Sequence, residues 1–398
     1  MDSALNPFTP GSGARPAALV GRDSEIAAAT ALIRRAAANN KPARSQMLWG
    51  LRGVGKTVLL KEIRDSFVAA GWLTVSLEAQ RDENAAQMAR RALARDLIVS
   101  ARKLRSRRDK VGSAFTRMLE TITAFSLTAG VAGVSFGVDL KPSRGRADSN
   151  DLDIDLLELV EDATTALAEE HVGFVVFVDE IQDLDPTTLA SLLSAQHAAS
   201  QDGRHFYVFG AGLPNVPATL SEARSYAERQ FDYREIDRLK DSDARLAFTD
   251  PVQDRDVEFA PGAVDSLVTA SGRYPYFIQE FGHHAWELAS GDTITSDDAD
   301  LAASHGTDAL DRGFFRARWE RATRAEQTMM AAMAQDGDGR STITDVVERL
   351  GKSRPSDLSV RRKALIAKGL IYAPARAELA FTVPHMGAYI SRVHHDLL

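Results

Sequence analysis

The sequence contains no cysteine and no long apolar run. Without cysteine, the 398-residue chain cannot form disulfides, iron–sulfur clusters or cysteine-ligated zinc sites. No apolar stretch reaches the roughly 20 residues that a membrane-spanning helix needs, and residues 1–19 lack the positive region and apolar block of a signal peptide. We therefore expect a cytoplasmic protein with no membrane partner.

Charge is distributed unevenly along the chain. The whole chain has a net charge of −7, which argues against a surface adapted everywhere to nucleic acid. Residues 340–398 nevertheless hold ten Lys/Arg and five Asp/Glu, a local charge of +5 (10 − 5). The length predicts two or three domains. An acidic body with a basic C-terminal part predicts that the two parts have different roles.

Hydrophobic periodicity predicts an α/β protein. After an extended leader at residues 1–19, helices and strands alternate: helix 23–37, strand 45–49, helix 57–70 and strand 72–77. This order is typical of a parallel sheet. Further strands are predicted at 174–178, 205–209 and 231–236, and further helices at 84–110 and 151–169. Residues 125–140 alternate apolar with small residues and contain three glycines, a pattern that predicts an inserted β-hairpin.

The C-terminal half has a different pattern. Helices without strands are expected from 239 to 311, as in a helical lid. From 312 to 398 the sequence predicts helices at 325–335, 343–350 and 356–368, followed by strands near 370–372 and 379–383. Three helices and a two-stranded wing describe a winged helix-turn-helix. The predicted division is a leader at 1–19, a sheet domain at 20–238, a lid at 239–311 and a winged helix at 312–398.

A phosphate-binding loop follows the first strand. Gly50-Leu51-Arg52-Gly53-Val54-Gly55-Lys56-Thr57 matches the pattern GxxxxGK[ST]. Glycines let backbone N–H groups surround phosphate oxygens, a lysine reaches the β- and γ-phosphates, and a hydroxyl ligates magnesium. The following helix directs its positive end at the anion. The sequence therefore predicts binding of ATP with Mg²⁺ by a P-loop domain, through Gly50, Gly53, Val54, Gly55, Lys56, Thr57 and Val58.

Two carboxylates end the apolar strand at 174–178. Asp179 is placed to hold the magnesium shell together with Thr57, and Glu180 is placed to polarise the attacking water. Glu180 and Lys56 are the candidate catalytic residues. A nucleotide switch without hydrolysis needs no such glutamate, so its presence favours a competent hydrolase over a dead nucleotide site.

Two more segments extend the resemblance to a known family. Val20-Gly21-Arg22, followed by Glu25, precedes the phosphate loop, and Gly272-Arg273-Tyr274-Pro275-Tyr276-Phe277-Ile278-Gln279 is similar to the G-x-P-x-x-I/L-Q segment of a helical lid. With both Walker motifs, the chain resembles AAA+/STAND-type ATPases, in particular the archaeal-type and origin-recognition-like ones. The resemblance implies an ASCE-type sheet. It also implies that Val20, Gly21 and Arg22 pack around adenine and that Pro275 contacts the nucleotide.

The chain departs from that family in three respects. The strand at 205–209 runs into Gly210-Ala211-Gly212, with no Asn or Thr to sense the γ-phosphate. About 120 residues separate the Walker motifs, roughly twice a minimal spacing. Arg224 and Arg229 are candidates for an arginine finger, although a solvated helix end explains both equally well. Arg273 is either a lid sensor or a cap of the preceding helix.

The C-terminal part is the candidate for partner binding. In the third helix Leu358 and Leu365 define a buried stripe, with Arg361 and Arg362 on its two sides. Ser356, Ser359 and Lys363 point outward, and Arg354 and Arg376 can contact phosphates of double-stranded DNA. The rival interpretation is a protein–protein contact, in which the winged helix closes on the ATPase core. The basic stretch from Arg102 to Lys110 is either a solvated face or a nucleic-acid contact.

Other motifs carry no site. Asp336-Gly337-Asp338-Gly339 lacks the glycine and glutamate positions of a calcium loop. The pairs His283-His284 and His394-His395 lack further zinc ligands. The sequence thus predicts an ATP-hydrolysing switch that acts on DNA through its winged helix. The alternative is a STAND-type signalling or defence ATPase that assembles with itself or with a protein partner.

Overall fold

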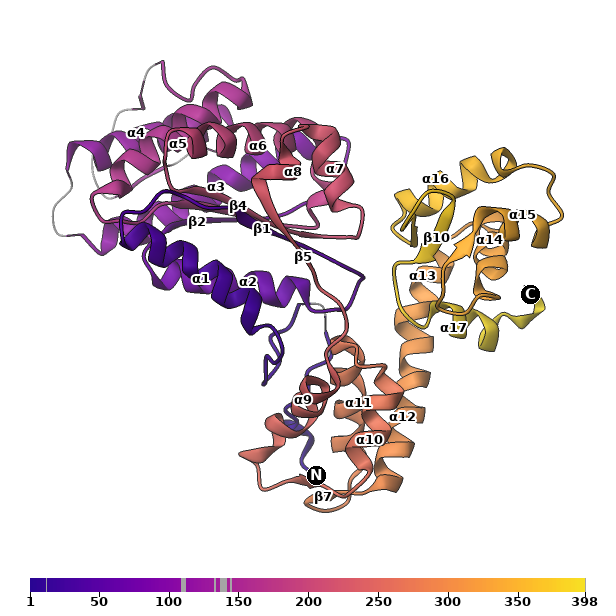
Figure 1. Cartoon of the computed structure of the whole chain (residues 1–398). Helices are drawn as coiled ribbons and strands as arrows, with labels where there is room; N and C mark the ends of the chain where they lie inside the picture. The colour runs from indigo at the N-terminus through magenta and orange to yellow at the C-terminus, as the bar shows by residue number, and fades with distance from the viewer. Residues whose placement is uncertain (12, 109–111, 132–133, 137–141, 144, 398) are drawn as a thin grey trace. The chain divides into compact units, whose positions relative to one another are not determined.

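The computed structural model describes residues 1–11, 13–108, 112–131, 134–136, 142–143 and 145–397. The chain forms two compact units (Figure 1). The sheet unit comprises residues 22–49 and 56–235, and the helical unit comprises residues 1–21, 50–55 and 236–398. In the described residues, no helix is both long and apolar enough to cross a membrane.

The sheet unit is built on five parallel strands in the order β2-β3-β4-β1-β5. The strands are β1 (Ser45–Trp49), β2 (Leu73–Glu78), β3 (Phe174–Asp179), β4 (Phe206–Gly212) and β5 (Phe231–Glu235). Residues 174–178 of β3 are almost fully buried, as a central parallel strand requires. The predicted α/β fold with a parallel sheet is confirmed.

Helices cover both faces of this sheet (Figure 1). One face carries α1 (Asp23–Ala37) and α2 (Lys56–Ala69), and the other carries α4 (Ser113–Thr128), α5 (Leu152–Ala168) and α6 (Pro186–Gln201). The unit also contains α3 (Ala85–Ser106), the 3-10 turn η2 (Ile181–Asp183), α7 (Val216–Ala223) and α8 (Ala227–Gln230). Apolar side chains of α3 to α6 form one core with the sheet.

The hairpin predicted at 125–140 is wrong where the structure describes it. Residues 125–128 form the last turn of α4, whose Phe115, Met118, Ile122 and Phe125 share one buried face at helical spacing. Gly130, with φ of 76°, follows the C-cap and terminates the helix instead of turning a hairpin. Residues 132–133 and 137–140 of the predicted hairpin lie outside the described residues.

The helical unit begins with the leader, which is packed rather than free. Its short 3-10 turn η1 spans Ser3–Leu5, and Phe8 is only 1% exposed. Phe8 fits where a side chain at Gly282 would collide, because a Cβ at that glycine would lie 2.4 Å from its ring. Asn6 adds a hydrogen bond to the His283 carbonyl. The leader is thereby held against the lid helix that contains Gly282.

The lid consists of α9 (Asp241–Gln253), α10 (Ala263–Ser271), α11 (Pro275–Leu288) and α12 (Ser296–Leu310), with a two-stranded sheet of β6 (Glu258–Phe259) and β7 (Thr293–Ile294). A π-helical segment, η3 (Asp311–Phe315), joins α12 directly to α13 (Arg316–Glu320). The boundary predicted at residue 312 therefore falls inside a continuous helical run, without a linker.

The C-terminal part contains α14 (Arg324–Ala334), α15 (Ile343–Arg349), the 3-10 turn η4 (Pro355–Leu358), α16 (Ser359–Ala367), α17 (Met386–Val393) and η5 (His395–Leu397). Its antiparallel sheet has the order β8-β10-β9, formed by Ser341–Thr342, Glu378–Phe381 and Ile371–Tyr372. The sequence analysis predicted the three helices and the last two strands, but it missed β8 and α17.

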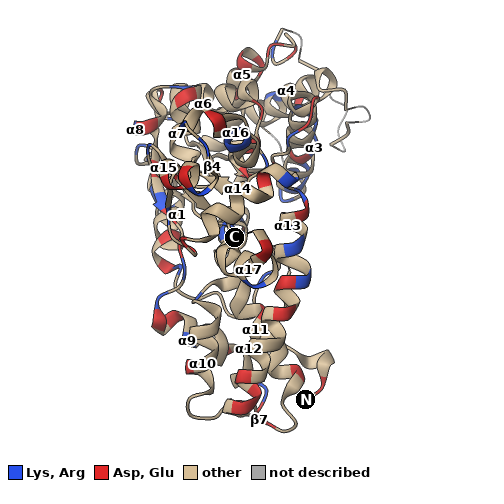
Figure 2. Cartoon of the chain, turned by 90° about the vertical axis from the view of Figure 1, so that its right-hand side faces the viewer, with Lys and Arg blue, Asp and Glu red and all other residues tan. Residues whose placement is uncertain are grey.

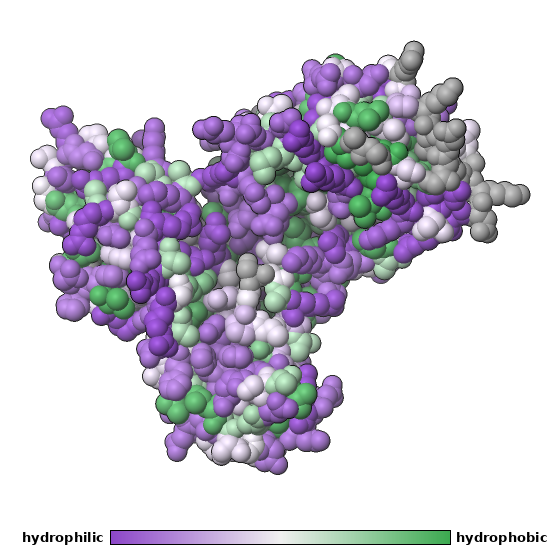
Figure 3. All heavy atoms as spheres, turned by 180° about the vertical axis from the view of Figure 1, so that it is seen from behind, coloured by the Kyte–Doolittle hydropathy of each residue, from purple (hydrophilic) through white to green (hydrophobic). Residues whose placement is uncertain are grey.

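The surface is mostly polar. Figure 2 shows basic side chains on α16 and both signs of charge along the run that contains α13. On the face seen in Figure 3, hydrophilic residues dominate and the apolar patches are small. Two exposed apolar side chains matter below: Met88 on α3 is 45% exposed, and Val360 on α16 is 79% exposed.

Candidate nucleotide site

The loop between β1 and α2 has the backbone that its glycines predict. Gly53 and Gly55 have φ of 86° and 90°, a region that side-chain-bearing residues rarely occupy. Gly50 is required for lack of space, because a Cβ at this position would lie 2.0 Å from the Ile236 carbonyl oxygen. All three positions need glycine, and a glycine loop of this kind can direct backbone N–H groups at an anion.

The start of α11 lies against this loop within the helical unit. The Tyr276 N–H donates to the Gly53 carbonyl over 3.2 Å. A Cβ on Gly55 would lie 4.0 Å from Pro275. Pro275, predicted to contact the nucleotide, is thus next to the phosphate loop. Gly21 packs against α9, because a Cβ there would lie 2.6 Å from Asp243 Oδ2.

The two predicted magnesium ligands meet in the sheet unit. The Thr57 hydroxyl, in the first turn of α2, donates to Asp179 Oδ2 over 2.7 Å. The other oxygen of Asp179 accepts the Glu180 N–H at 2.9 Å. A hydroxyl oxygen and a carboxylate oxygen side by side are ligands that suit Mg²⁺, so these two residues fit the metal. Lys56 precedes Thr57 and is only 8% exposed.

Comparison with known proteins agrees with this geometry. The family described as AAA ATPase domain matches residues 18–209, which include both Walker motifs. Residues 18–209 are thus similar to the AAA ATPase domain family. A second family, described as a domain of unknown function (DUF8462), matches residues 312–390. No curated protein matches the chain.

Solved structures place the whole chain in one fold. A Walker-type ATPase of Pyrococcus abyssi is similar with a TM-score of 0.60 and 14% identity, over 97% of this chain and 99% of that one. The ORC2 protein of Aeropyrum pernix, solved in ADPNP and ADP complexes, is similar with a TM-score of 0.51 and 15% identity, over 97% and 96%. The fold is that of the archaeal-type, origin-recognition-like P-loop ATPases.

The glutamate after Asp179 has an unusual backbone. Glu180 has φ of 49° and ψ of 42°, the left-handed region that costs a non-glycine residue energy. Its carboxylate is held by Gln182, whose Nε2 donates to Glu180 Oε2 over 2.6 Å. A carboxylate held in this way next to Asp179 is compatible with the predicted role of Glu180 as the water-polarising residue.

Gln182 also contacts the end of β4, where the sequence analysis found no sensor residue. Its Oε1 accepts the Leu213 N–H over 3.0 Å. A Cβ on Gly212 would lie 2.3 Å from this oxygen, so the glycine at this position makes room for the Gln182 amide. The sequence analysis missed Gln182, because nothing in the local pattern links residue 182 to residue 213.

The arginine candidates lie in different places. Arg224 donates from Nε to Ser194 Oγ over 3.2 Å and lies 3.7 Å from Asp153, which favours a structural role. Arg229 lies in the last turn of α8 and is exposed. Arg273 follows α10 with a left-handed φ of 64°, and its carbonyl accepts the Leu239 N–H. The C-cap of α10 is Gly272, so Arg273 lies just beyond the end of the helix.

The basic stretch of α3 is largely engaged within the domain. Arg102 donates to the Ser135 carbonyl and Arg105 to that of Arg108. Arg108 pairs with Glu170 and lies 4.3 Å above the Phe115 ring. Lys110 lies outside the described residues. These contacts favour a structural role for the stretch over nucleic-acid binding.

The predicted DNA-facing side chains are exposed. Leu358 and Leu365 are buried, whereas the five candidates for DNA contact are all exposed: Arg354, Ser356, Ser359, Lys363 and Arg376. The helical wheel therefore predicted the orientation of α16 correctly. It did not draw attention to Val360, an exposed apolar side chain on the same helix.

Proposed function

We propose that this protein is an ATP-hydrolysing molecular switch. The observation that carries the proposal is the contact between Thr57 and Asp179 at the end of a glycine loop with left-handed Gly53 and Gly55. Lys56 binds the β- and γ-phosphates, and Thr57 and Asp179 hold the metal. Mg²⁺ supplies positive charge that offsets the charge developing on the phosphates. Glu180 orients the attacking water and accepts its proton.

Nucleotide binding and phosphate release by the purified chain test this proposal. We expect ATP to bind in the presence of Mg²⁺ and phosphate to be released. Binding without release would show a switch that exchanges nucleotide but does not hydrolyse it. An absence of both would refute the assignment of the site.

Gln182 is expected to position Glu180. Replacing Gln182 with alanine removes its hydrogen bond to Glu180 and holds the carboxylate less firmly, so kcat should fall roughly tenfold to a hundredfold while KM changes little. The variant Gln182→Glu places a second carboxylate at Glu180. The like charge should lower kcat further and change the pH–rate profile of the variant.

A second variant separates positioning from general damage. Gly212→Ala puts a methyl group against Gln182 Oε1 and should lower kcat as Gln182→Ala does. Gln201→Ala, at the exposed end of α6, is the control and should leave both constants unchanged. If kcat and the pH profile of the Gln182 variants match those of the wild type, Gln182 does not act on Glu180.

We further propose that the C-terminal part is a winged helix that binds double-stranded DNA. The support is the exposed set of cations on and near α16 and the local charge of +5. An exposed Val360 beside Ser359 and Lys363 adds an apolar contact of the kind that reads a thymine methyl group. Hydrolysis would then switch the protein between states that differ in DNA affinity.

Charge reversal tests the DNA proposal. Binding of the full-length chain to duplex DNA should weaken with salt, with a slope of about −2 to −4 in log affinity against log salt for two to four phosphate contacts. The double variant Lys363→Glu, Arg376→Glu should weaken binding similarly for all sequences, because phosphate contacts do not read bases. Arg255→Glu, an exposed reversal on the lid, is the control. An absence of binding at low salt, with and without ATP, would end the DNA proposal.

The second candidate function is binding of a partner protein. Contacts of the C-terminal part with the phosphate loop and near the start of α11 favour it. The backbone N–H of Arg52, inside the phosphate loop, donates to the Thr382 carbonyl over 3.0 Å. Tyr276 stacks on Phe314 at 4.8 Å, and Arg318 lies 3.7 Å above Phe314. Burial, with a smaller effect of Arg52, lowers the pKa of Arg318 to about 10. In this proposal, nucleotide at the loop competes with the C-terminal part and releases it toward a partner.

His385 gives the packing of the C-terminal part on α11 a pH dependence. Its ring lies 5.3 Å from that of Phe277 in α11. Burial is the main cause that lowers the pKa of His385; Arg238 and Arg392 act in the same direction, and Asp338 opposes them. A lowered pKa means that the packed form binds fewer protons. The contribution of His385 to stability is therefore present above the ordinary histidine pKa of about 6.5 and is lost as pH falls below it.

We expect His385→Asn to reduce the acid sensitivity of the melting temperature. Asparagine tolerates the left-handed backbone of this position, where φ is 60°. His171, which is exposed and also left-handed with φ of 54°, provides the matched control His171→Asn. The measurement is Tm between about pH 5.5 and 7.5, around the histidine pKa. Equal acid sensitivity in the His385 variant and the wild type would contradict this role.

A further inference from the structure

Strand β2 forms one edge of the sheet. Helix α3 caps the N–H groups along this edge only in part. Along β2, alternate residues direct their N–H groups away from β3, since Leu73 and Ala79 donate to the β3 side. The outward N–H of Thr74 donates to Ser100 Oγ over 3.0 Å, and that of Ser76 donates to Asp96 Oδ2 over 2.6 Å. Side chains spaced four residues apart on α3 therefore cap successive edge positions.

This capping series stops at Glu78. Its N–H is the next outward group, and the α3 residue one turn beyond Asp96 is Ala92, which has no acceptor. No partner for the Glu78 N–H is found among the described residues. An uncapped N–H on an edge strand is a template for pairing with another chain.

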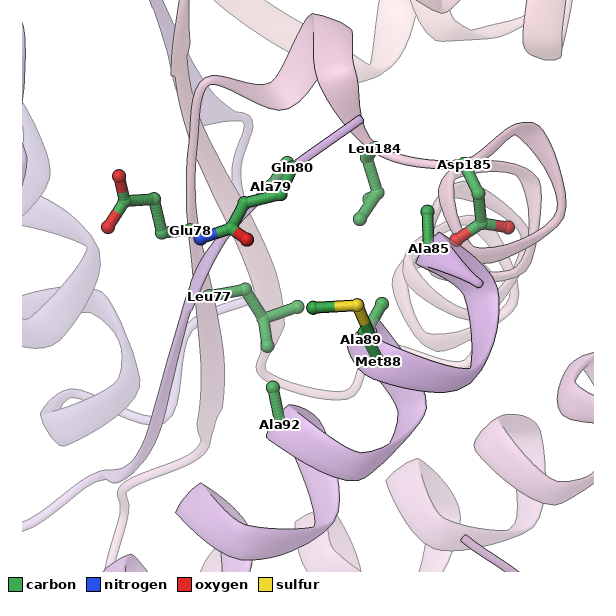
Figure 4. Close-up of a pocket in the computed structure, with 10 residues that line it drawn as sticks. All are labelled: Leu77, Glu78, Ala79, Gln80, Ala85, Met88, Ala89, Ala92, Leu184 and Asp185. Atoms are coloured by element: carbon green, nitrogen blue, oxygen red, sulfur yellow. The ribbon is translucent and has the colours of Figure 1, made fainter. Parts of the chain in front are cut away.

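A hollow of about 160 Å³ lies at this uncapped position. Figure 4 shows Leu77 of β2 and Met88 of α3 pointing toward one another across it, with Leu184 above. Ala85, Ala89 and Ala92 form the α3 side, where short side chains leave the space open. The volume suits one long side chain and is smaller than the roughly 300–1,000 Å³ of pockets for drug-sized ligands.

The hollow is negatively charged. Of the residues that line it, Glu78 and Asp185 are carboxylates and none is a cation. Arg81, a nearby cation in the chain, is paired with Asp183. Asp185, which lines the hollow, accepts the Thr188 N–H with Oδ1, but its Oδ2 is buried without a hydrogen-bond partner in the described part of the chain. A buried carboxylate oxygen without a donor is costly, and a cationic partner would relieve that cost.

We propose that this edge is a docking site for an extended segment of a partner protein that carries an arginine or lysine. The partner's backbone carbonyl accepts the Glu78 N–H and extends the sheet beyond the end of α3. Its aliphatic stem lies between Leu77 and Met88, whose flexible side chain adapts to it. Its cationic end reaches Asp185. Nucleic acid is a poor occupant, because the carboxylates of Glu78 and Asp185 at the hollow repel phosphate.

Hydrogen exchange and peptide binding to the full-length protein test the proposal. The probe is a fluorescein-labelled peptide of alternating Thr and Val, about nine residues long, with a central Arg; its counterpart has a central Glu. We expect the Glu78 amide to exchange faster than that of Ser76 in the free protein and to slow when the Arg peptide binds. The Glu peptide should bind at least about tenfold more weakly.

Three variants locate the binding. Ala92→Asp supplies the missing cap as Asp96 does at Ser76, and it should abolish peptide binding while protecting the Glu78 amide. Asp185→Asn keeps the helix cap but loses the charge, and it should lower the affinity for the Arg peptide by about 10- to 100-fold. Ala86→Asp, an exposed change on the same helix, should bind as the wild type does. The proposal is overturned if neither peptide binds, if both bind equally, or if Ala92→Asp binds normally.

Discussion

Replacing Lys56 with alanine is expected to abolish ATP binding or to weaken it by about 10²–10⁴-fold. The ammonium makes charge-assisted hydrogen bonds to the β- and γ-phosphates, each worth about 1.5–3 kcal/mol, and two such bonds correspond to that range in Kd. Lys56 is buried at the start of α2, so no exposed cation can move into its place. Calorimetric titration with ATP and Mg²⁺ measures the loss.

The control for this variant is one turn further along the same helix. Lys61 is exposed, and Lys61→Ala removes an equal charge while leaving the phosphate loop intact. Its ATP affinity should equal that of the wild type. Circular dichroism and Tm show whether Lys56→Ala is folded, because a buried lysine can also contribute to packing through its aliphatic stem. Equal affinity in a folded Lys56→Ala variant and the wild type would refute the site.

The strands of the sheet were predictable because the residues buried in them are mostly apolar. A run such as Phe174–Val178 contains no polar residue, and this pattern is typical of a central parallel strand. The phosphate loop was equally clear, since its glycines are required by local backbone geometry. The contact between Thr57 and Asp179 followed from the fold, as parallel strands bring their carboxyl ends, and the loops that follow them, to one edge of the sheet.

The failures have physical reasons as well. Residues 125–128 alternate like a strand, but their burial is set by α4, whose apolar face begins ten residues earlier at Phe115. The two-residue strand β8 and the packing of Phe8 on α11 depend on partners far along the chain. Gln182 was missed for the same reason, because its role depends on the glycine at 212 and the N–H at 213.

Replacing Glu180 with glutamine is expected to keep ATP binding and to lower kcat by about 10²–10⁴-fold, the usual contribution of a general base. The amide has the shape of the carboxylate and can still accept from Gln182 Nε2, but it cannot take a proton from water. The metal ligands Thr57 and Asp179 are unchanged, so Kd for ATP should stay near its wild-type value. Phosphate release at saturating ATP, with Kd measured in parallel, separates the two effects.

A neighbouring carboxylate shows whether the effect belongs to Glu180 alone. Glu78 ends the adjacent strand β2 in register with Asp179, and it is exposed. Glu78→Gln removes the same charge from the same edge of the sheet, so a loss due only to reduced negative charge would occur in both variants. Because Glu180 alone is held by Gln182 in a left-handed backbone beside the metal ligands, only Glu180→Gln should lose turnover. Phosphate release at the wild-type rate in Glu180→Gln would show that another group activates the water.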